Sequence, residues 1–170
     1  MKRKYWLLLL VFAVLQNGSP VLADGDFYVI AGGSGVGTRI TSVPYEIKNP
    51  GFYYLSGNLT YSGSTNAITV SADDVTLDLM GFSLTNSGAP GTTNGIHMSG
   101  RSNVEIRNGT VRGFYRGVCE LGGGNYHRAI NVRATGNTKG IYWGGYHCLI
   151  KGCNASNNGG DGLFLNSGLS

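Results

Sequence analysis

The sequence contains little charge and no helical pattern. Charged residues make up 13% of its 170 residues, against about a quarter in typical globular domains. Beyond residue 23, no window keeps apolar residues at the i, i+3, i+4, i+7 spacing of an amphipathic helix. Low charge together with 41% hydrophobic residues argues against disorder. The composition therefore excludes a helical bundle and favours a folded, all-β protein.

Cysteine is scarce and odd in number. Cys119, Cys148 and Cys153 exclude a fully paired disulfide framework, although one bridge stays open in an oxidising compartment. Soft or borderline metal ligands occur as well: His97, Met98, Cys119, His127, His147, Cys148 and Cys153. Their spacing matches no closed zinc or copper motif, so no metal site and no cofactor is predicted.

The first 23 residues have the pattern of a secretory signal peptide. Basic residues 2–4 precede an apolar run from Trp6 to Leu15, and Val21-Leu22-Ala23 offers small residues for cleavage. The run is shorter than the ~20 residues of a membrane span. We therefore expect a secreted, periplasmic or cell-surface protein without a membrane span. Without residues 2–4, 10 basic residues face 9 acidic ones, so no nucleic-acid partner is predicted.

Glycine is abundant, with 29 residues, and it marks an internal repeat. The key apolar positions of the repeat are spaced 28, 22, 23 and 22 residues apart, and they are Ile68, Ile96, Val118, Ile141 and Leu163. An insertion at 87–93 explains the longer first spacing. Second alternating runs recur inside the units at 75–79, 104–107 and 130–133. Units of about 22 residues without a helix cannot bury a core alone, so they must stack as coils of a parallel β-solenoid.

Two longer segments carry a family resemblance. The segments 73–82 and 102–111 resemble bacterial right-handed parallel β-helix repeat proteins of the pectate-lyase-like superfamily, and 44–47 with 50–55 resemble their entry segment. The resemblance implies an all-β, right-handed parallel β-helix. Its members include polysaccharide lyases, hydrolases and surface proteins, so the fold alone does not select a function.

The repeat divides the chain into four parts. We expect a signal peptide at 1–23, a flexible N-terminal arm at 24–43, an N-terminal capping segment at 44–65 and β-helix coils at 66–170. The segment 163–170 begins a further coil without a cap, which predicts a truncated stack. An open strand edge there would allow self-association through the end of the helix.

One predicted outward column contains Thr69, His97, Cys119, Tyr142 and Phe164. Because exposed aromatic rings can stack on sugar rings, His97, Tyr142 and Phe164 are candidate ligand-binding residues for a polysaccharide. The alternative, which we favour, is a structural ladder of stacked side chains.

A second predicted outward column contains Asp78, Arg107 and Arg133, with Thr76, Glu105 and Asn131 beside it. A lyase of this superfamily needs a base and cations around a uronate carboxylate, so Asp78, Glu105, Arg107 and Arg133 are candidate catalytic residues. An exposed ionic ladder is the favoured alternative. Hydrolysis requires two carboxyl groups across one bond, and only Asp78 and Glu105 share a face. A lyase is therefore favoured over a glycoside hydrolase.

Glu120 breaks the apolar pattern, because Met98, Trp143 and Leu165 occupy the equivalent positions. A bulge at 122–124 would turn Glu120 outward and bring Leu121 in. If Glu120 is instead buried beside a charge partner, it becomes a site candidate.

Three functions follow, and the sequence leaves open whether the protein is an enzyme. The leading hypothesis is an exported β-helix module that binds carbohydrate or serves as a surface scaffold. The second is a polysaccharide lyase acting on acidic glycans, and the third is a periplasmic metal-handling protein.

Overall fold

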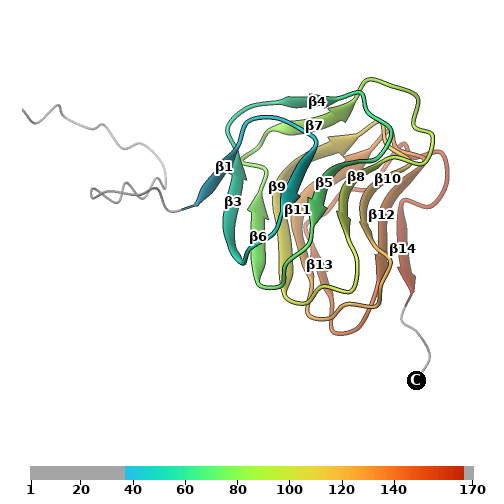
Figure 1. Ribbon diagram of the computed structural model, residues 1–170. Helices are drawn as coiled ribbons and strands as arrows, with labels where there is room; N and C mark the ends of the chain where they lie inside the picture. The colour runs from blue at the N-terminus through green and yellow to red at the C-terminus, as the bar shows by residue number, and fades with distance from the viewer. Residues whose placement is uncertain (1–36, 167–170) are drawn as a thin grey trace, which may run out of the picture. The chain divides into compact units, whose positions relative to one another are not determined.

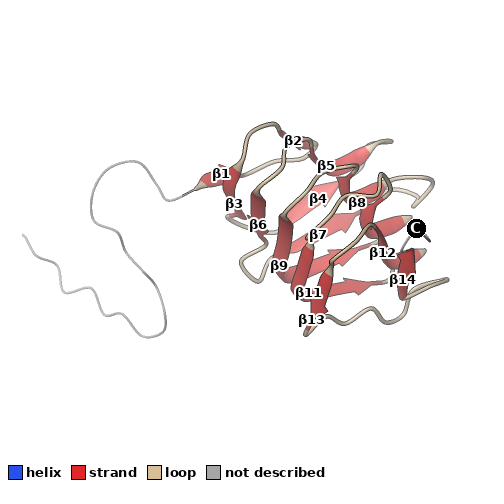
Figure 2. Ribbon diagram, turned by 90° about the horizontal axis from the view of Figure 1, so that it is seen from below, coloured by secondary structure: helices blue, strands red, loops and turns tan. Residues whose placement is uncertain are grey.

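The computed structural model describes residues 37–166, and all regular structure within them is β-strand (Figures 1 and 2). The strands form a parallel solenoid of about 5 turns, with coils about 23 residues apart. The predicted all-β solenoid is thus confirmed. The described part of the chain contains no helix long and apolar enough to cross a membrane. The predicted signal peptide lies outside the described residues.

One face of the solenoid is a six-stranded parallel sheet, here called sheet B. Figure 1 shows its later strands side by side. The strands are β2 (Tyr45–Ile47), β5 (Asn66–Val70), β8 (Asn94–Met98), β10 (Arg116–Glu120), β12 (Lys139–Gly144) and β14 (Leu163–Asn166). Their register aligns the five apolar positions of the repeat, from Ile68 to Leu163, in one ladder, as the spacing predicts.

The remaining strands form an eight-stranded sheet, here called sheet A (Figure 2). Its main path consists of β1 (Thr38–Ile40), β3 (Gly51–Leu55), β6 (Val75–Asp78), β9 (Val104–Arg112), β11 (Arg128–Thr135) and β13 (Leu149–Lys151). Off this path lie β4 (Leu59–Tyr61) and β7 (Ser83–Asn86). The first half of β9 pairs with β6 and its second half with β7, so β9 follows two faces of the coil.

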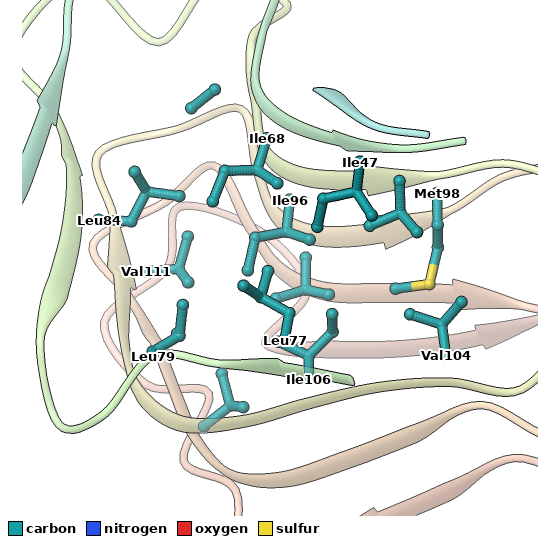
Figure 3. Close-up of a cluster of buried hydrophobic side chains, with 14 of the residues drawn as sticks. Ile47, Ile68, Leu77, Leu79, Leu84, Ile96, Met98, Val104, Ile106 and Val111 are labelled. Atoms are coloured by element: carbon teal, nitrogen blue, oxygen red, sulfur yellow. The ribbon is translucent and has the colours of Figure 1, made fainter. Parts of the chain in front are cut away.

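The core fills the space between these faces. Figure 3 shows Ile68 and Ile96 of sheet B, Leu77 and Ile106 of sheet A, and Leu84 of β7 converging on one interior. All five side chains are fully buried. Burying each contributes about 1.5–3 kcal/mol relative to exposure, so the apolar ladders supply the main stabilisation of a coil that has little charge.

An asparagine ladder stabilises one corner of the coils. Asn137 accepts a hydrogen bond from the Phe114 N–H at 3.0 Å and donates one to the Val111 carbonyl at 3.0 Å, both in the coil before it. Asn158 repeats this arrangement one coil later, toward the Asn137 N–H and the Ala134 carbonyl. The buried corner is therefore satisfied by side chains where the strands stop pairing.

The N-terminal expectations need one correction. Thr38–Ile40, which we expected within a flexible arm, forms strand β1 and pairs in parallel with β3. Alternation explains the strand, because Ile40 is fully buried whereas Thr38 and Arg39 are exposed. In the predicted capping segment, β2 extends sheet B beside β5.

Candidate functional site

The outer column of sheet B exists as the repeat predicts. Thr69 lies opposite His97, His97 opposite Cys119, Cys119 opposite Tyr142, and Tyr142 opposite Phe164. All are half-buried except Cys119, which is fully buried. The expectation that Cys119 is exposed was therefore wrong. Burial raises the pKa of its thiol to about 12, so it stays protonated and unreactive at neutral pH.

Two cations lie among the aromatic rings of this column. The Arg116 guanidinium carbon lies 4.6 Å from the Tyr115 ring centroid and 5.0 Å from that of Tyr142. The Lys139 ammonium lies 4.9 Å from the Tyr142 centroid and 5.9 Å from that of Phe164. These five residues are here called the basic-aromatic face. Such cation–π contacts are worth about 0.5–1 kcal/mol at exposed positions, and they hold the cations over the rings.

The rings of the basic-aromatic face also stack on each other. The centroids of Tyr142 and Phe164 are 4.5 Å apart, and their planes differ by 9°. This contact agrees with the structural ladder that we favoured for the column. It also covers the facing sides of both rings, so the cations, rather than these two ring faces, are the groups most available to a ligand.

The positive charge of this face is not balanced by acids. Arg116 and Lys139 form no ion pair with a carboxylate of residues 37–166. Next to Arg116, the buried Asn94 Oδ1, His97 Nδ1 and Arg116 Nε have no hydrogen-bond partner among the described residues. Burial lowers the pKa of His97, an effect that the charge of Glu120 opposes and that of Arg116 reinforces. Neutral His97 therefore leaves the charge to Arg116 and Lys139.

Our sequence reasoning did not find these cations. Each occupies the first position of a glycine-containing repeat, before Gly117 or Gly140, and the two lie opposite each other in register. The repeat alignment itself contained the signal, but attention to the position between two buried residues excluded it.

The outer face of sheet A carries an ion network instead. Arg107 Nε lies 2.7 Å from Asp78 Oδ2, and Arg107 Nη1 lies 3.2 Å from Glu105 Oε1. Arg128 Nε lies 2.8 Å from the other oxygen of Glu105. Asp78 also accepts hydrogen bonds from the Asn108 side chain and the Met80 N–H. The structure thus brings together three of the predicted residues, Asp78, Glu105 and Arg107, and balances their charges.

The fourth predicted residue, Arg133, does not belong to this column. Arg107 lies opposite Ile130, and Arg133 lies opposite Thr110, so the expected stacking of Arg107 on Arg133 was wrong. Asn131 does not lie beside Glu105 either, since Arg128 occupies that place. Asn131 has a left-handed φ of 54°, which bends β11 and resets the alternation of its side chains.

Arg133 instead borders an open, polar groove. Residues Thr110, Asn108, Asn131 and Asn154 line this groove together with Arg133, and its volume is about 490 Å³. None of its lining residues is acidic. The groove therefore offers hydrogen-bonding groups and one cation, but no carboxylate that could act as a base.

Glu120 is fully buried, in register with Met98 and Trp143. The expected bulge that turns it outward was wrong, and Leu121 is exposed instead. Backbone N–H groups satisfy its carboxylate in place of a charge partner. The donors and their distances are Gly100 (2.7 Å), Gly122 (2.8 Å), Gly123 (3.1 Å) and Gly124 (3.3 Å).

The three cysteines are free thiols. Within residues 37–166, no group of three or more His, Cys, Asp or Glu side chains is arranged to hold a metal ion. Cys148 lines a cavity of about 560 Å³ with Trp143, Leu163 and Leu165 at the last described coil. Burial raises the pKa of the Cys148 thiol.

Comparison with known proteins agrees with this architecture. The sequence profile of the family described as "Right handed beta helix region" matches residues 46–169. No curated protein and no solved structure matches the chain. The match covers well over half of the chain and coincides with the stacked coils, so this protein belongs to the right-handed β-helix family.

Proposed function

We propose that this protein is an exported β-helix module that binds an acidic carbohydrate on the basic-aromatic face of sheet B. The observation that supports the proposal is the pair Arg116 and Lys139, two adjacent cations without a carboxylate partner among the described residues. Export is supported by the signal-peptide pattern of the first 23 residues.

The chemistry of the face suits a sugar acid. A guanidinium and an ammonium donate charge-assisted hydrogen bonds to carboxylate or sulfate oxygens, and these are stronger than bonds between neutral groups. The two cations occupy neighbouring coils, and coils stack about 4.8 Å apart. Tyr115 and the edges of Tyr142 and Phe164 provide apolar surface beside the charges. A polysaccharide lying along the solenoid axis would meet these groups in succession.

Binding is favoured over cleavage because of the charge balance on sheet A. The lyase hypothesis requires cations that are available to a uronate. Arg107 and Arg128 are engaged by Asp78 and Glu105, and the groove at Arg133 is lined by no carboxylate. A cation that already pairs with an acid gains less from a second anion.

Titration calorimetry against polygalacturonate, alginate and a neutral glucan tests the proposal. We expect binding to the two acidic polymers, weakened by salt, and at least roughly tenfold weaker binding for the Arg116→Gln/Lys139→Gln double variant. Arg133→Gln, which removes one positive charge elsewhere, serves as the charge control. Equal loss of affinity in both variants would place the ligand elsewhere, and absence of binding to either acidic polymer would refute the proposal.

A ring-opening lyase would announce itself in the same samples. Cleavage beside a uronate creates an unsaturated product that absorbs ultraviolet light. Turnover abolished by Arg107→Gln, with folding intact, would overturn the choice of binding over catalysis.

A further inference from the structure

Four residues with left-handed backbone stack at the corner that leads into sheet A. Asp74, Asn103, Tyr126 and His147 have φ values of 55°, 53°, 59° and 56°. Each of the first three donates its N–H to the residue before the next corner, from Asp74 to Ser102, Asn103 to Asn125 and Tyr126 to Tyr146, at 3.1, 2.9 and 3.0 Å. The four therefore occupy equivalent positions in successive coils, here called the left-handed corner.

The side chains at this corner are of two kinds. Asp74 and Asn103 are types that tolerate a left-handed φ, and the Asn103 amide donates to the Asp74 carboxylate at 2.7 Å. Tyr126 and His147 are bulkier rings, and for bulky side chains this conformation carries strain. Their rings stack, with centroids 5.0 Å apart and planes that differ by 11°. Strained backbone that presents exposed rings is a reason to look for function.

The geometry leaves one ring face uncovered. His147 stacks on one side of Tyr126, so the other face of the phenol ring turns toward the coil of Asn103. An asparagine side chain is too small to cover that face, and Tyr126 is 58% exposed. A flat apolar surface thus lies next to an amide and a carboxylate that are themselves hydrogen-bonded to each other.

We propose that the left-handed corner is a second binding site, which takes a neutral pyranose unit. The C–H face of the sugar ring lies on the free face of Tyr126, and its hydroxyl groups donate to Asp74 and pair with the Asn103 amide. A neutral sugar fits because Asp73, beside Asp74, adds a second exposed carboxylate, whose oxygen accepts from the Ser102 N–H at 2.9 Å. Two carboxylates at the corner repel an anionic sugar.

Substitution with asparagine separates binding from stability at this corner. Tyr126→Asn removes the ring but installs a residue that suits a left-handed φ, so the folded state is retained or gains stability. Met80→Asn is the matched control, because Met80 is also exposed and has a left-handed φ of 52°, but lies at another corner.

Nuclear magnetic resonance titration of the protein with cellohexaose, xylohexaose and maltohexaose is the test. We expect at least one of these neutral probes to shift the Tyr126, His147 and Asn103 resonances, with at least roughly tenfold weaker binding in Tyr126→Asn and wild-type binding in Met80→Asn. Two results would overturn the proposal: no shift of these resonances at millimolar concentrations of any probe, or unchanged binding in a folded Tyr126→Asn variant. Neutral probes carry no charge for Arg116 and Lys139, so this test is independent of the acidic-glycan experiment.

Discussion

The carboxylate of Glu120 lies in the core ladder of sheet B in register with Trp143, a position that every neighbouring coil gives to an apolar residue. Its partners are the backbone N–H groups of the glycine-rich loop that follows β10 and of Gly100 in the previous coil. A nest of N–H groups binds an anion by fixed partial charges. Glu120 thereby anchors a loop that has no side chains of its own to pack.

Glu120→Gln should destabilise the fold. The amide group that replaces one oxygen cannot accept hydrogen bonds, so buried N–H groups lose their acceptor, at a cost of about 1–3 kcal/mol. Urea unfolding followed by circular dichroism measures the change. Glu46→Gln is the exposed control, for which we expect a clearly smaller effect. Equal effects in the two variants would mean that the nest around Glu120 contributes no stability.

His127 should make stability depend on pH. Burial lowers its pKa below the ordinary value of 6.5, although the charge of Glu120 opposes this effect. The folded state therefore binds fewer protons than the unfolded chain at mildly acidic pH. The free energy of unfolding should fall as the pH drops below about 6.5 and continue to fall until His127 is protonated in the folded state.

Urea titrations at several pH values between about 5 and 8 test this expectation. His127→Gln removes the titrating ring and should reduce the slope, while His97, whose pKa burial also lowers, retains a part of it. A slope that is identical in the wild type and in His127→Gln would contradict the assignment.

Arg107→Gln and Arg133→Gln should differ in their effect on stability. Loss of Arg107 leaves the nearly buried Asp78 without its charge partner, which costs about 1.5–3 kcal/mol for a hydrogen bond to a charged group. Arg133 is exposed and pairs with no acid among residues 37–166, so its loss should stay within about 0.5 kcal/mol. Paired thermal or urea unfolding curves decide. Similar destabilisation by both would contradict the register of β9 and β11.

Cys119 should resist alkylation in the native protein. Its thiol is buried and its pKa is raised to about 12, whereas reaction requires an accessible thiolate. In a Cys148→Ser/Cys153→Ser variant, iodoacetamide at pH 8 should label Cys119 only after denaturant is added, as mass spectrometry would record. Rapid labelling of the folded variant would show that the outer face of sheet B opens more readily than its packing implies.

Sequence periodicity was sufficient for the stacking of coils on sheet B. The glycine-apolar motif at Ile96, Val118 and Ile141 predicts one ladder, and the strand register confirms it. The physical reason is that a solenoid repeats its environment with each coil, so equal spacing in sequence becomes equal position in space. The outward column at His97 and Tyr142 follows from the same alternation.

Alternation failed where the backbone leaves the strand conformation. Asn131 has no feature in the sequence that separates a corner from a strand position, yet its left-handed φ moves Arg133 away from Arg107. Likewise, burial of Cys119 depends on which neighbouring side chains fold over it, and alternation describes only the direction of its own side chain.

The sequence by itself determined that the chain is a β-solenoid and which apolar residues form its core, because these follow from a repeat that local pattern expresses. The tertiary structure alone decided which charges are neutralised, that Glu120 lies inside, and that Arg116 and Lys139 stand without acidic partners among the described residues. Charge balance and hydrogen-bond satisfaction depend on atoms in neighbouring coils, 20 or more residues away, and no local pattern specifies those distances.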